Sequence, residues 1–115
     1  METFNLIEIA AKCRPLEDVQ GLANAIRRTV KSMSWGSRSW TLRQVAGVTI
    51  GLQFRVSGHH HKGLVILTVN GADLFDIYLT KLNGEIKEKI SDIYLEDLID
   101  VIDRKVEYVS TYENR

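Results

Sequence analysis

The feature that most constrains this chain is a ten-residue segment, 48–57, in which apolar residues alternate with polar or small ones. The apolar members are Val48, Ile50, Leu52, Phe54 and Val56. A period of two places these side chains on one face of a β-strand and the others on the opposite face. The segment therefore predicts a strand in a sheet with one buried face, and the rest of the chain must supply its neighbours and its cover.

Turn signals on both sides of this strand predict the neighbours. Glycines bound the segment 58–63, which leads to a second apolar run at 64–69, so these two strands pair most simply as a hairpin. Asn83-Gly84 suits a type I′ turn, in which both central residues need positive φ. Further strands are expected at 40–45, 75–79 and 85–91. The prediction is an antiparallel meander of four to five strands.

Two amphipathic segments predict helices, because apolar residues recur at intervals of three and four in 16–33 and in 94–110. Segment 3–12 is too short for its periodicity to decide between helix and strand. The two helices are the elements available to cover the sheet, so the predicted fold class is α+β. We expect a two-layer sandwich with an N-terminal and a C-terminal helix on one sheet face, in a single domain spanning 1–115.

The opposite sheet face is predicted to be a polar surface without a cover. Its side chains would come from the alternate positions of the strands, namely Gln53, Arg55, Thr68, Asp76, Tyr78 and Thr80. Such a surface is usually in contact with water. It is also a place where a ligand can bind.

Composition excludes several classes of protein. Lys plus Arg equals Asp plus Glu at 15 each, which argues against a uniformly basic polyanion binder. Cys13 is the single cysteine, so a disulfide scaffold is excluded and a reducing compartment is favoured. No apolar run approaches the roughly 18 residues of a membrane helix, and no signal peptide is recognisable. We expect a cytoplasmic protein without a membrane partner.

The charges are nevertheless unevenly distributed. Segment 12–43 holds seven basic and two acidic residues, whereas the chain from Asp73 onward holds eleven acidic and six basic ones. The C-terminal helix is expected to carry an acidic stripe made of Glu96, Asp100, Asp103 and Glu107. Segregated charge can steer a charged partner, hold the two helices together or support self-association. Two ordinary solvated helix faces are the alternative.

The candidate binding residues lie around a predicted connection rich in glycine and serine. Tryptophan and arginine are enriched at interface hot spots, and both can stack on nucleic-acid bases. The candidates are Arg27, Arg28, Trp35, Arg38 and Trp40. The alternative is that both indole rings close the end of the core.

No pattern predicts catalysis or a cofactor. The adjacent histidines 59–61 stand in a glycine-bounded turn, where we expect them to be solvated. Adjacent side chains diverge, so at most two could reach one metal ion, and without a nearby carboxylate or cysteine they make a poor structural site. Cys13 lies between Lys12 and Arg14, which are expected to lower its pKa slightly, but no motif supplies a catalytic partner. Nucleotide-binding and hydrolase motifs are absent. We expect no metal, no cofactor and no enzymatic activity.

Two stretches, 69–82 and 93–103, resemble small uncharacterised proteins of phages, prophages and other mobile genetic elements. The resemblance implies an accessory protein that binds a host factor, and it transfers no site residue. We therefore expect a small intracellular binding protein with a protein partner, and a homodimer formed through the N-terminal half, where an outer strand would carry little charge. Nucleic-acid binding through the basic helix face and the loop between Trp35 and Trp40 is the alternative.

Overall fold

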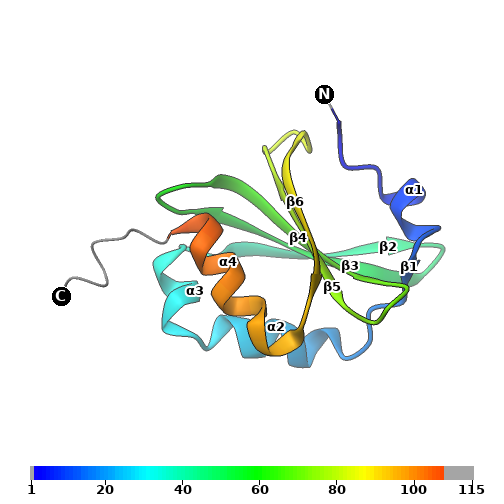
Figure 1. Ribbon diagram of the computed structural model, residues 1–115, viewed down its shortest axis with the longest axis horizontal. Coiled ribbons are helices and arrows are strands. Elements are labelled where there is room, and N and C mark those ends of the chain that lie inside the picture. Colours follow the sequence, from blue (N-terminus) through cyan, green and yellow to red (C-terminus); the bar gives the residue numbers. More distant parts are fainter. Residues whose placement is uncertain (1, 108–115) are drawn as a thin grey trace.

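Five antiparallel strands form a meander in the order β2-β3-β4-β5-β6 in the computed structural model, which describes residues 2–107 (Figure 1). The strands are β2 (Arg38–Val45), β3 (Val48–Ser57), β4 (Lys62–Asn70), β5 (Phe75–Thr80) and β6 (Ile86–Ile93). A two-residue strand, β1 (Cys13–Arg14), pairs with the end of β4. The predicted meander is confirmed, with boundaries close to the expected ones.

The helices lie on both sides of this sheet. The helical segments are α1 (Leu6–Ala10), α2 (Val19–Arg27), α3 (Val30–Ser34), η1 (Leu95–Asp97) and α4 (Leu98–Val106). In Figure 1, α2, α3 and α4 lie on one side of the sheet and α1 lies on the other. The predicted N-terminal and C-terminal helices on one face are therefore confirmed. Segment 3–12, for which the sequence left two alternatives, contains the helix α1.

The expected helix over 16–33 is two helices, because Thr29 interrupts it. Thr29 is extended, and its hydroxyl accepts a hydrogen bond of 3.0 Å from the Ser32 N–H, so it caps the start of α3. The change of direction turns Val30 and Met33 outward, where they are 79% and 75% exposed. The prediction of one apolar stripe through these two residues was wrong. The helical start expected at residue 16 was also wrong, since α2 begins after its N-cap at Asp18.

The prediction for the C-terminal helix was correct for the centre of the helix but wrong for its start. Leu98, Ile102 and Val106 are buried as expected, whereas Leu95 is 61% exposed because it lies in the 3-10 turn η1. The expected end of this helix, at residue 110, lies outside the described residues.

The turn at Asn83-Gly84 is not of the predicted type I′. Gly84 has φ of 93°, but Asn83 is absent from the residues with positive φ in the described chain. The Gly84 N–H donates to the Lys81 carbonyl at 2.9 Å, and the Lys81 N–H donates to the Glu85 carbonyl at 2.9 Å. A type I turn followed by a glycine in the left-handed region forms this hairpin instead.

The face under α2, α3 and α4 carries the main apolar core. Phe54 of β3 lies between Trp35 and Trp40, with ring centroids 6.5 Å and 4.2 Å away. The Trp35 indole N–H donates to the buried Asp103 carboxylate at 3.0 Å, which satisfies two polar groups inside the core. Other buried members include Ile77, Leu79, Leu98 and Ile102.

The other sheet face is covered too, which corrects the prediction of an open polar surface. Thr68, Asp76, Tyr78 and Thr80 are all buried. Phe4, just before α1, packs on Ile66 and Tyr78, with its ring edge-on to the tyrosine at 5.1 Å. The run Leu64–Leu67 in β4 is explained by this arrangement, because a strand covered on both faces needs apolar residues at successive positions.

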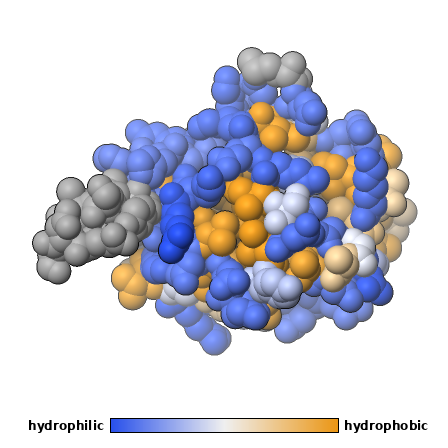
Figure 2. All heavy atoms as spheres, viewed as in Figure 1, coloured by the Kyte–Doolittle hydropathy of each residue, from blue (hydrophilic) through white to orange (hydrophobic). Residues whose placement is uncertain are grey.

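The face of the molecule drawn in Figure 2 is mainly polar. Figure 2 shows polar side chains over most of one face, with apolar side chains gathered near its centre, where α4 lies against the sheet. No helix within residues 2–107 is long and apolar enough to cross a membrane.

Candidate functional site

The structure separates the five predicted binding residues into exposed arginines and partly or fully buried tryptophans. Arg27, Arg28 and Arg38 are exposed. The Trp35 ring is fully buried, and Trp40 is half-buried. Arg27 and Trp40 are brought together, with the guanidinium carbon 4.6 Å from the ring centroid. The tryptophans therefore serve the core, and the arginines remain available to a partner.

Two further arginines extend this group along β2 and β3. Arg38 stands directly opposite Arg55 in the β2-β3 register, and opposite residues of an antiparallel pair point to the same face. Arg43 donates to the Gln53 side chain at 2.9 Å, and its guanidinium lies 5.6 Å from the Phe4 ring centroid. Within residues 2–107, none of Arg27, Arg28, Arg38, Arg43 and Arg55 forms an ion pair. We call Arg27, Arg38, Arg43 and Arg55 the arginine edge, whereas Arg28 is the exposed C-cap residue of α2.

The arginine edge coincides with an open strand. In the described part of the chain, no main-chain group outside β3 hydrogen-bonds to β2. The β6 edge differs: the Ile86 N–H donates to the Glu2 carbonyl, and the Phe4 N–H donates to the Gly84 carbonyl, both at 2.8 Å. β2 is thus the outermost strand on its side of the sheet. It presents unpaired backbone groups beside the arginine edge, and no member of this edge has an acidic partner within residues 2–107.

A second candidate is a hollow of about 590 Å³ between the N-terminal segment and the covered sheet face. One wall comes from residues 2–9 and the other from β5 and β6, with Lys12 and Cys13 at one end. Most of its lining side chains are polar or charged: Glu2, Thr3, Asn5, Glu8, Lys12, Cys13, Asn70, Asp76, Tyr78 and Lys89. The hollow is the feature that sequence reasoning missed. The double-sided apolar run in β4 was the available signal that something covers this face.

Four titratable groups of the hollow influence one another. Burial raises the pKa of the Cys13 thiol, although its contact with the Thr68 hydroxyl opposes the shift. Burial also raises the pKa of Tyr78. Burial disfavours the charge of Lys89, but its interactions with Tyr78 and Asp76 outweigh this and raise its pKa. The site thus holds a protonated thiol, a protonated phenol and a charged amine. The slight lowering of the Cys13 pKa expected from Lys12 and Arg14 was wrong, because burial dominates.

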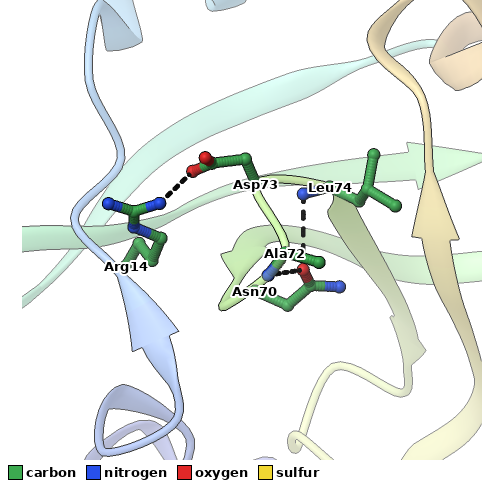
Figure 3. Close-up of polar contacts among 5 residues, drawn as sticks. All are labelled: Arg14, Asn70, Ala72, Asp73 and Leu74. Atoms are coloured by element: carbon green, nitrogen blue, oxygen red, sulfur yellow. Dashed lines mark hydrogen bonds and ion pairs between the residues drawn. The ribbon is translucent and has the colours of Figure 1, made fainter.

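Asn70 fixes the position of the acidic group in this cluster. Its side-chain oxygen accepts from the Ala72 and Leu74 N–H groups at 2.9 Å and 3.3 Å, which holds the turn after β4 (Figure 3). Its amide donates to the Asp76 and Asp92 carboxylates at 3.0 Å and 2.8 Å. All four hydrogen-bonding positions of the side-chain amide are used. The turn is tied to β1 by an ion pair of 2.7 Å between Arg14 and Asp73 (Figure 3).

Some of the segregated charges form contacts within the protein. Lys31 of α3 pairs with Asp100 of α4, and this hydrogen bond lowers the pKa of Asp100. The predicted acidic stripe is broken up, because Asp103 is buried against Trp35 and Glu107 accepts from the His59 N–H at 2.8 Å. Several acidic side chains of the C-terminal half are therefore paired within the protein, whereas no ion pair within residues 2–107 neutralises the arginine edge.

The three histidines do not share one environment. His59 and His60 are exposed, but His61 is buried, which corrects the expectation of three solvated rings. The His61 Nε2 lies 3.0 Å from the Leu64 carbonyl oxygen, so it donates there, and Nδ1 lies 3.3 Å from the Lys87 amine. Burial lowers the pKa of His61. No group of three histidine, cysteine or acidic side chains suited to a metal ion occurs within residues 2–107.

No family model, no curated protein and no solved structure matches this chain.

Proposed function

We propose that this protein is a cytoplasmic binding module that captures an extended, acidic segment of another protein along the edge of β2. One observation carries the proposal: Arg38 and Arg55 lie opposite each other with no acidic group in ion-pair range among the described residues. Like charges directly opposite in a sheet are destabilising. An anionic partner would relieve that repulsion on binding.

The open edge determines the class of partner. An extended peptide adds a strand to an exposed sheet edge through main-chain hydrogen bonds, and its side chains supply specificity. β2 is eight residues long and offers such an edge. A nucleic acid would use the arginines but not the strand edge, and the fully buried Trp35 is not available for base stacking. A polypeptide uses both features of the surface, so it is the better fit.

The resemblance of residues 69–82 and 93–103 to proteins of mobile genetic elements suggests the source of the partner protein. We propose that the acidic segment belongs to a host protein and that the protein acts by binding it rather than by catalysis.

The test uses a fluorescent peptide that alternates glutamate with β-branched residues, and a matched peptide with glutamine in place of glutamate. We expect only the acidic peptide to bind, with an affinity that weakens as salt is added, and we expect Arg38→Glu to abolish binding. Arg104→Glu is the matched control, because this exposed arginine lies on α4 and is not part of the arginine edge. Equal binding of both peptides, or tighter binding of single-stranded DNA than of the acidic peptide, would contradict the proposal.

The same edge is where we expect the homodimer to form. Two β2 strands can pair around a two-fold axis, and Leu42 on β2 is 44% exposed. The arginines of two copies repel each other, so the dimer should be weak and the acidic peptide should dissociate it. Sedimentation velocity at about 100 μM would reveal even a weak dimer. Leu42→Lys should give monomers with unchanged helix content, and a strictly monomeric wild-type protein would remove the prediction.

A further inference from the structure

The hollow beside α1 combines the two features that mark a binding site. Its volume of about 590 Å³ lies within the range of small-molecule sites. Cys13, Asp76, Tyr78 and Lys89 converge on it from β1, β5 and β6 and interact electrostatically with one another. Interacting titratable groups gathered in a concave site are characteristic of functional sites.

A buried polar atom next to this cluster has one weak partner. The Thr68 hydroxyl is fully buried and has no hydrogen bond of standard geometry within the described residues. Thr68 lies beside Asp76 in the β4-β5 register, on the face that carries the hollow, and it interacts with the Cys13 thiol. A thiol is a weak hydrogen-bonding group, so this buried hydroxyl is only partly satisfied on the side where Cys13 lines the hollow.

The charges of the lining define the chemistry of the ligand. Lys12 and Lys89 form no ion pair within residues 2–107, and neither do Glu2 and Glu8. Asp76 is already held by the Asn70 amide and by the Asp92 N–H. A purely anionic ligand would approach the carboxylates of Glu2 and Glu8, and a purely cationic one would approach the amines of Lys12 and Lys89. Only a ligand with both charges complements both.

We propose that the hollow binds a small zwitterion of the amino-acid class. Its carboxylate would lie at Lys89, whose amine is 5.4 Å from the Tyr78 ring centroid, and its amino group would lie at Glu8 on α1. Ile9 and Ile86 provide apolar surface for a side chain. Such a ligand would bridge α1 to β6. This site is separate from the β2 edge, so either can fail without the other.

Cys13 provides a direct probe, because it is the single cysteine of the chain and it lines the hollow. Each of the nineteen protein amino acids without a thiol would be added at about 5 mM, a concentration that detects millimolar affinity. The rate of Cys13 alkylation by N-ethylmaleimide and the amide resonances of α1 and β6 would be measured. We expect at least one amino acid to slow alkylation more than threefold and to shift those resonances. If none of the nineteen does so, the proposal fails.

Blocked ligands and variants test the assignment of the two charges. The N-acetyl and the C-amide derivative of the bound amino acid should each bind more than tenfold more weakly. Lys89→Met should remove the preference for a free carboxylate, and Glu8→Gln should remove that for a free amine. Tyr78→Phe provides a second test of the carboxylate end if Lys89→Met misfolds. Lys105→Met and Glu96→Gln, at exposed positions outside the hollow, are matched controls. Equal binding of blocked and free ligands would overturn the assignment.

Discussion

The two faces of the sheet differ in how completely they are covered. β4 contributes to both: Val65 and Leu67 face the helical layer, while Ile66 packs under Phe4 near α1. The helical layer is formed by α2, α3 and α4 and encloses an apolar core, whereas the five-residue helix α1 leaves a hollow of about 590 Å³. Complete apolar cover serves stability. The incomplete cover leaves a hollow lined by polar and titratable groups, and such groups can bind a ligand.

The largest expected effect comes from the helix-covered face. Ile102 is fully buried, so Ile102→Ala should lower the free energy of unfolding by about 2–5 kcal/mol. Leu95→Ala is the matched control, because this leucine is exposed and should cost little. Urea denaturation measures both. Equal losses from the two variants would mean that the helical layer is not the main source of stability.

On the opposite face, the largest expected loss of stability comes from replacing a polar residue, Asn70. Asn70→Ala removes four hydrogen bonds and leaves the buried Asp76 with fewer donors, so we expect a loss of about 1–3 kcal/mol. Asn83→Ala removes one hydrogen bond in an exposed turn and should cost less. Chemical denaturation would compare the two. A neutral Asn70→Ala would show that the turn and the acidic group are held by other contacts.

Two five-residue helices allow a direct comparison of the faces. The Thr29 hydroxyl caps α3 by accepting from the Ser32 N–H at 3.0 Å, and the Asn5 side chain caps α1 by accepting from the Glu8 N–H at 3.2 Å. Thr29→Ala should cost about 1 kcal/mol in global stability, since α3 leads directly into the buried Trp35. Asn5→Ala should cost less globally but should accelerate hydrogen exchange in α1. A larger global loss from Asn5→Ala would reverse the ranking of the two faces.

The smallest expected effect is a pH dependence from His61. Burial lowers its pKa in the folded state, so the unfolded state binds a proton more readily. The contribution of neutral His61 is therefore complete above its ordinary pKa of about 6.5 and is lost as the pH falls below that value. Stability curves should flatten over this range in His61→Asn and keep their slope in His59→Asn, whose ring is exposed. Identical slopes in wild type and His61→Asn would contradict this.

The sequence allowed the strands to be predicted better than the site. Alternation in 48–57 identifies β3 because it reflects a local property, the direction of successive side chains. The break at Thr29 was missed because threonine occurs both at helix caps and within helices, so its presence alone does not predict a break. Only the packing of Trp35 in the core shows where α3 must change direction. Arg27, Arg28 and Arg38 were identified as candidates from composition, but the opposition of Arg38 and Arg55 depends on strand register.

The sequence by itself determined the α+β class, the meander and the apolar centre of α4, since these follow from periodicity and turn residues within short windows. Only the tertiary structure decided that residues 2–10 cover the second sheet face. It also decided that Trp35 is buried against Asp103 and that Cys13, Asp76, Tyr78 and Lys89 meet. These contacts join residues far apart in the chain, and their formation depends on how whole elements pack, which no local pattern encodes.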